Sequence, residues 1–102
     1  MTEAKKIIDL INYNDGAVVS KTIIDKPTGT VTLFAFDRDQ SLSEHTAPFD
    51  AILNVIDGEA EVKIDQEKFN LSAGEMIILP ASHPHSLRAT NKFKMILTMI
   101  KE

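Results

Sequence analysis

Cysteine is absent from the 102 residues of this chain. Its absence excludes disulfide bonds, thiolate metal sites and cysteine nucleophiles. A protein without thiols tolerates both oxidising and reducing surroundings, so this composition does not assign a cellular compartment. The sequence also lacks a G-x-S-x-G motif, a glycine-rich phosphate loop and paired carboxylates at a spacing suited to catalysis. The common nucleophilic and phosphate-binding classes of enzyme are therefore not indicated.

Long apolar runs are also missing. No stretch approaches the roughly 20 residues that are needed to cross a bilayer as a helix. Near the N-terminus, Asp9, Asn12 and Asn14 interrupt the apolar residues, which is not the pattern of a secretory signal peptide. We therefore expect a soluble, cytoplasmic protein.

Positively charged residues are fewer than negatively charged ones. The chain has 11 lysines and arginines against 15 acidic residues, for a net charge of −4. A surface of this sign repels phosphate backbones and anionic lipids, so neither nucleic acid nor a membrane is expected as a partner. Hydrophobic residues make up 43% and charged residues 25%, the balance of a globular protein. Because a chain of this length has room for one hydrophobic core, we predict a single domain over residues 1–102.

Short β-strands separated by turn residues are the dominant pattern. The pair Asp57-Gly58 lies between two of them and predicts a hairpin turn, with Glu59 and Glu61 on the solvated surface beside it. Only residues 2–13 are suited to a helical turn or two. Many short strands at regular spacing predict an all-β sandwich or barrel. The predicted strands are 18–24, 30–36, 51–56, 61–64, 68–71, 76–79 and 93–100.

Two of the predicted strands are apolar on both faces, which is unusual where one face of a sheet meets water. Isoleucines left in water forfeit about 1.5–3 kcal/mol each, so some cover is expected. We predict a two-fold symmetric homodimer built on this outer face of the sheet. The alternative is that the apolar N-terminal residues 7–11 fold over it. The residues that need cover are Ile52, Ile56, Ile96 and Ile100.

Histidine is confined to two segments of the chain, each of which carries a motif. Residues 39–58 read DQSLSEHTAPFDAILNVIDG, and residues 74–89 read GEMIILPASHPHSLRA. Together they resemble the two signature motifs of the cupins. His45 falls on the first histidine of the first motif and Gly58 on its closing glycine. The matches to the second motif are Gly74, Pro80 and His85.

This resemblance implies a cupin double-stranded β-helix, that is, a jelly-roll barrel of antiparallel strands, here with a short N-terminal extension. Cupins of the fuller type bind a metal through three histidines and a glutamate. Ala47 and Ala51 stand where the second histidine and the glutamate are expected. The metal ligands that the resemblance implies for this chain are therefore His45 and His85, for a divalent transition metal such as Fe, Ni, Mn or Zn.

The candidates for a third metal ligand are His83 and Gln40, and the sequence does not decide between them. Gln40 lies in a loop that can reach inward, whereas Glu44 has the wrong strand parity relative to His45. His83 is two residues from His85 and could share its face, but its place in a proline-containing turn is also typical of an exposed loop residue.

We expect an apolar pocket beside the histidines, and a small organic molecule bound in it with or without a metal ion. A metal-dependent oxygenase, isomerase or decarboxylase that acts on a small organic substrate is the alternative function. A third alternative is a structural dimer with a filled barrel. The residues predicted to line the pocket are Ala47, Phe49, Ala51, Leu53, Met76 and Met95.

Overall fold

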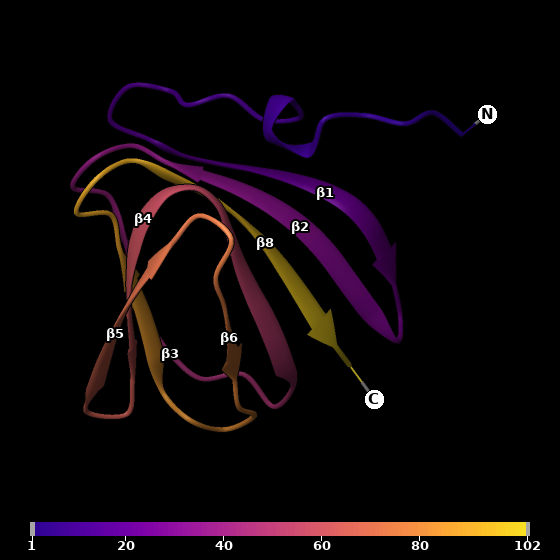
Figure 1. The fold of residues 1–102 in the computed structure, drawn as a ribbon. Helices are drawn as coiled ribbons and strands as arrows, with labels where there is room; N and C mark the ends of the chain where they lie inside the picture. Colours follow the sequence, from indigo (N-terminus) through magenta and orange to yellow (C-terminus); the bar gives the residue numbers. More distant parts are fainter. Residues whose placement is uncertain (1, 102) are drawn as a thin grey trace.

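The computed structural model describes residues 2–101, and almost all of its regular structure is antiparallel β-strand (Figure 1). One turn of 3₁₀ helix, Ile7–Asp9, lies in the segment where a helical turn was predicted. The predicted all-β class is confirmed. The described part of the chain contains no helix long and apolar enough to cross a membrane. The strands are β1 (Val18–Lys26), β2 (Gly29–Phe36), β3 (Ser41–His45), β4 (Asp50–Ile64), β5 (Glu67–Ser72), β6 (Met76–Leu79), β7 (His85–Arg88) and β8 (Phe93–Ile100).

The strands form two sheets that curl around one core and share β4. Sheet A has the strand order β1-β2-β8-β4-β6, and sheet B has the order β3-β7-β4-β5. All of the pairings are antiparallel. Residues 50–58 of β4 pair with β8 in sheet A, and residues 59–64 pair with β5 in sheet B. One long strand therefore carries the chain from one sheet to the other.

The structure of the middle of β4 differs from the hairpin turn that the sequence predicted there. Asp57-Gly58 lies inside this strand and not in a hairpin turn, and Glu59 and Glu61 are strand residues. The register with β8 shifts just before Asp57, which marks a β-bulge. An Asp-Gly pair suits the bend that follows the bulge as well as a turn, because Gly58 adopts a positive φ there.

Gly58 makes this corner possible. Its φ is +72°, a conformation that residues with a side chain rarely adopt. A Cβ atom at this position would also collide with the backbone carbonyl oxygen of Lys92, just before β8. Glycine is needed here because the neighbouring backbone passes so close to the bend.

The main core lies between the two sheets. Phe36 and Phe93 are paired across β2 and β8, and their rings stack with centroids 4.5 Å apart. Sheet A also contributes Ala51, Leu53, Val55, Leu79 and Met95, sheet B contributes Ala60, Val62, Leu71 and Leu87, and Ala89 follows just beyond β7.

The N-terminal segment covers part of the outer face of sheet A. Ile11 is only 4% exposed and packs in a second cluster with Leu33 and Ala35. Ile56 and Ile96 pack against this cluster, so the N-terminal segment gives these two isoleucines the cover that the sequence predicted they need. Figure 1 shows the N-terminal segment running alongside β1. The homodimer stays a prediction.

Candidate functional site

Pairing of β3 with β7 brings His45 and His85 together. His45 ends β3, His85 begins β7, and the two residues lie opposite each other. The register shifts between Leu42 and His45, so β3 contains one extra residue. With a regular pleat, Glu44 would lie opposite His85. The bulge sets His45 there instead, as bulges beside functional sites often do.

The two imidazole rings face each other through their Nε2 atoms, which lie 3.1 Å apart. The Nδ1 atom of His45 lies 2.8 Å from the carbonyl oxygen of Ser43, and that of His85 lies 3.2 Å from the carbonyl oxygen of His83. A carbonyl oxygen only accepts, so both of these contacts are hydrogen bonds when each ring carries its hydrogen on Nδ1. In that tautomer, the Nε2 atoms of two neutral rings direct lone pairs at each other.

Two lone pairs at this distance repel, and a positive charge between them removes the repulsion. A shared proton or a metal ion would supply that charge. At the usual metal–nitrogen distance, nitrogens 3.1 Å apart subtend roughly 100° at the ion, which suits two neighbouring ligands. Hydrogen bonds from Nδ1 to backbone carbonyls also fix the tautomer and orientation of metal-ligating histidines. The residues of this pair therefore fit a divalent transition metal ion.

His85 is the buried member of the pair. It is 8% exposed, whereas His45 lies at the surface. Burial lowers the pKa of His85 below the ordinary value of 6.5, and the charge of His45 lowers this pKa further, while the hydrogen bond to the His83 carbonyl opposes the shift. His85 is therefore neutral at physiological pH, and its Nε2 lone pair is available to a metal ion.

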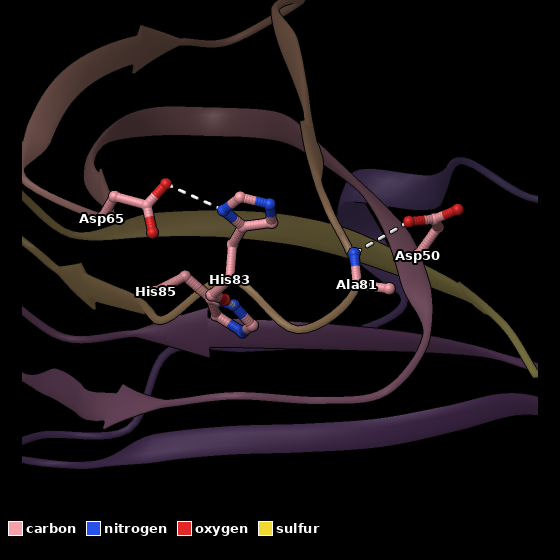
Figure 2. Close-up of polar contacts among 5 residues, drawn as sticks. All are labelled: Asp50, Asp65, Ala81, His83 and His85. Carbon is pink, nitrogen blue, oxygen red and sulfur yellow. Dashed lines mark hydrogen bonds and ion pairs between the residues drawn. The ribbon is translucent and has the colours of Figure 1, made fainter.

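His83 contributes its backbone to the pair but not its ring. The ring points to the other side of the loop from that of His85 (Figure 2). Its Nδ1 lies 2.9 Å from Oδ2 of Asp65, and both of these side chains are 52% exposed. This placement matches the interpretation of His83 as an exposed loop residue.

Gln40, the other candidate for a third ligand, lies at the far end of the ladder between β3 and β7. Its carbonyl oxygen accepts a hydrogen bond from the backbone of Ala89, just beyond β7. The five residues from Gln40 to His45 span about 16 Å in an extended strand. Within residues 2–101, no group of three or more histidine, cysteine or acidic residues is positioned to hold a metal ion. Of the predicted ligand residues, the structure brings only His45 and His85 together.

The turn before β7 is held in place from the other side of the site. The backbone N–H of Ser82 donates to the carbonyl oxygen of Ala47 at 2.7 Å. The N–H of Ala81 donates to Oδ1 of Asp50 at 2.8 Å, as Figure 2 shows. These bonds fix the turn whose carbonyl orients His85. Ala47, predicted to line a pocket, acts here through its backbone.

The six residues predicted to line one interior pocket are not brought together. Ala51, Leu53 and Met95 are buried in the packed core. Ala47 and Phe49 lie half-buried in the connection between β3 and β4.

Met76 is placed differently from the prediction. It is 47% exposed and faces outward from β6. In this four-residue strand, Ile77 and Leu79 contact the core, so strand alternation turns Met76 away from it.

A groove of about 600 Å³ lies next to the histidine pair, where β5 and β6 leave an opening between the sheets. Ile64 lines this groove and is the cross-strand neighbour of His85. The groove therefore lies beside the histidine pair. The sequence did not predict this groove, because the pairing of β4 with β7 brings Ile64 to His85. The other lining residues are Asp65, Gln66, Glu67, Phe69, Ile77, Ile78 and Pro80.

Comparison with known proteins identifies the family. Residues 32–101, which include His45 and His85, match the sequence profile described as the cupin domain. No curated protein gives a significant match. A solved structure of a conserved protein of unknown function from Streptococcus pyogenes is 32% identical, with a TM-score of 0.90, and the match covers 99% of this chain and 91% of that one.

Two further structures are similar. A cupin 2 conserved barrel domain protein from Leptotrichia buccalis is 36% identical, with a TM-score of 0.90 over 93% of this chain and 46% of that one. A cupin superfamily protein from Desulfitobacterium hafniense shows the same fold at 22% identity, with a TM-score of 0.95 over 100% of this chain and 94% of that one. Because the profile spans well over half of its length, the chain belongs to the cupin domain family.

Proposed function

We propose that this protein binds a small organic molecule in the groove between β5 and β6, next to a divalent transition metal ion held by Nε2 of His45 and Nε2 of His85. The observation that carries the proposal is the 3.1 Å approach of two Nε2 atoms whose rings are both oriented by hydrogen bonds from Nδ1 to carbonyl oxygens. Iron, nickel, manganese and zinc are the candidate ions.

A pair of protein ligands leaves most coordination positions of such an ion free. Water or a polar group of the bound molecule would fill them. The site therefore binds metal more weakly than a site with three or four protein ligands, and the ion exchanges readily. In this site the protein orients two imidazole nitrogens toward the ion and keeps His85 unprotonated.

The groove favours a molecule with an apolar body. Ile64, Phe69 and Ile77 line it and also pack against the core. Asp65 and Glu67 supply the acidic part of its rim. Pockets for small molecules usually combine apolar walls with a few polar groups of this kind.

The test is a metal titration of tag-free protein that has been stripped with a chelator. Isothermal titration with Ni²⁺ or Zn²⁺ should show one ion bound per chain. His85→Gln and His45→Gln should each lower the affinity by on the order of 100-fold, because each removes one of two ligands.

His83→Gln is the matched control for these variants. It removes a histidine from the same segment but leaves the carbonyl oxygen that orients His85, so its affinity should stay within about threefold of the parent protein. Binding by His85→Gln equal to that of the parent protein would disprove the metal site.

The organic ligand is tested separately, by screening aromatic and aliphatic fragments with NMR. Fragments that bind should shift the signals of Ile64, Phe69 and Ile77, and these shifts should change when Ni²⁺ or Zn²⁺ is added. Binding elsewhere on the barrel would contradict the assignment of the groove.

A metal-dependent enzyme is the second candidate function. This candidate is supported by the histidine pair, because two protein ligands would leave most coordination positions of a bound ion open to a substrate. Any activity measured with the metal-loaded protein should then be lost in His85→Gln and kept in His83→Gln. Activity that survives His85→Gln would exclude this mechanism.

A further inference from the structure

A polar hollow of about 370 Å³ lies on the outer face of sheet B. Val62 and Leu87 of this sheet pack into the core, so their neighbours along β4 and β7 project to the opposite face. The hollow shares no lining residue with the groove beside the histidine pair. Basic and hydroxyl side chains from all four strands of the sheet line it, namely Lys63, Lys68, Arg88, Ser41, Ser43 and Ser86.

Cross-strand pairing brings the basic residues of the hollow together. Lys63 of β4 lies directly opposite Lys68 of β5. On its other side Lys63 pairs with Ser86 of β7, and Arg88 lies two residues along β7 from Ser86. Cβ atoms of directly opposite residues are about 4.5–5.5 Å apart, and those of diagonal neighbours about 7–8 Å. The three positive charges therefore occupy adjacent positions on one face of the sheet.

Two lysines directly opposite each other destabilise a sheet, because their charges repel. The nearby carboxylates offset this repulsion only in part. Nζ of Lys68 lies 3.9 Å from Oε1 of Glu61, which is a long distance for an ion pair. Within residues 2–101, neither Lys63 nor Arg88 forms an ion pair, although Glu61 lies directly across from Arg88. Two of the three cationic groups are therefore available to an anion.

The donors at this hollow match a phosphate group better than a carboxylate. A phosphate monoester carries about two negative charges and has three free oxygens. The guanidinium of Arg88 can bind two of these oxygens side by side, and the ammonium of Lys63 can neutralise the remaining charge. Ser86 is the neighbour of both residues and supplies a hydroxyl donor. A carboxylate has one charge and two oxygens, so it would leave one of these groups without a partner.

The small extent of the positive region favours a small ligand. Three basic side chains meet at the hollow, beside the acidic residues Glu44 and Glu61, whereas the chain as a whole has a net charge of −4. A membrane or a nucleic acid would present phosphates over a much wider area and would meet the acidic remainder of the surface. A small phosphate ester contacts the hollow alone.

We propose that the hollow on the outer face of sheet B binds the phosphate group of a small phosphate ester. Arg88 binds two phosphate oxygens, Lys63 neutralises the charge, and Ser86 donates a hydrogen bond between them. Lys68 exchanges its long ion pair with Glu61 for the phosphate, which also relieves its repulsion with Lys63. The site lies on the opposite face of the sheet from the histidine pair and acts without it.

Binding is tested with the full chain, stripped of metal so that the result does not depend on the metal site. Glycerol 3-phosphate is the probe, followed in phosphate-free buffer by isothermal titration and by NMR of the backbone amides. We expect saturable binding with a Kd of about 1 mM or below. The amide signals of Lys63, Ser86 and Arg88 should shift. Acetate has less charge and should bind with a Kd at least roughly fivefold higher.

Substitutions at the hollow should change the affinity in both directions. Arg88→Gln and Lys63→Gln should each raise the Kd by about tenfold, because each removes a charged contact to the phosphate. Glu61→Gln should lower the Kd by roughly threefold, since it removes the carboxylate that competes for Lys68. Loss of folding does not raise affinity, so this third variant separates binding from stability.

Lys26→Gln is the matched control. It removes the same charge from an exposed lysine at the end of β1 in sheet A and should leave the Kd within about twofold of the parent protein. Absence of saturable binding, or an equal rise in Kd for Lys26→Gln and Arg88→Gln, would overturn the proposal. Amide shifts confined to other strands would do the same, as would tighter binding to anionic lipid vesicles or to a single-stranded oligonucleotide than to the ester.

Discussion

Asp37 accepts two backbone hydrogen bonds in the loop after β2. Its Oδ2 accepts from the N–H of Gly16 at 2.7 Å, and its Oδ1 accepts from its neighbour Arg38 at 2.9 Å. The bond from Gly16 is the larger cause that lowers the pKa of this carboxyl below 3.8, and the bond from Arg38 adds to it. One side chain thus ties the end of the N-terminal segment to the end of β2.

The lowered pKa predicts how the stability of Asp37→Asn depends on pH. Below its ordinary pKa the unfolded carboxyl binds a proton that the folded one does not, so this stabilisation is complete at neutral pH and is lost as pH falls through the folded pKa. Urea unfolding should find the parent protein more stable than Asp37→Asn at about pH 7, and this difference should shrink as the pH falls below the ordinary value of 3.8. A difference in the free energy of unfolding that stays constant as the pH falls below this value would contradict the role given to Asp37.

Single residues also show where sequence reasoning stops. Motif spacing was enough to select His45 and His85, which the structure brings together. Motif spacing did not show where Gln40 and Met76 lie relative to the histidine pair. The direction of Met76 depends on which face of β6 meets the core, and the distance of Gln40 from the pair depends on strand pairing. Neither is written in the local sequence.

At the scale of elements, two bulges do most to shape the site. One, in β3, sets His45 rather than Glu44 opposite His85. The other, in β4, lies between Val55 and Asp57, just before the chain crosses between the sheets. The adjoining pair Asp57-Gly58 was visible in the sequence, but its role was mistaken for that of a hairpin turn. The close approach of Lys92, which tells the two apart, is a long-range contact.

Gly58→Ala tests the corner of β4. A methyl group there meets the carbonyl oxygen of Lys92 and must also adopt positive φ, so the free energy of unfolding should fall by on the order of 3 kcal/mol or more. Gly16→Ala is the matched control: φ is also positive, at +66°, but nothing lies within 4 Å of its Cβ. This control should lose only about 1–2 kcal/mol. Equal losses in chemical unfolding would show that β4 can bend without the close contact.

At the scale of the whole molecule, the all-β architecture followed from the sequence because alternation and turn residues repeat along the chain. The sequence also showed which outer residues are apolar, but it did not show which of them are covered and which are exposed. Only the fold shows that Ile56 and Ile96 lie under the N-terminal segment while Ile100 stays open. Which part of the outer face of sheet A is covered depends on where the N-terminal segment lies.

The Nε2 atoms of His45 and His85 lie 3.1 Å apart, and we propose that they are metal ligands. Long-range ¹H–¹⁵N NMR of the imidazole nitrogens tests it most directly, at about pH 8, above the ordinary histidine pKa. Both rings should carry their hydrogen on Nδ1, and Zn²⁺ should shift both Nε2 signals together while leaving the ring of His83 unchanged. A hydrogen on Nε2 of both rings in the metal-free protein, or Nε2 signals that do not respond to Zn²⁺, would contradict the account.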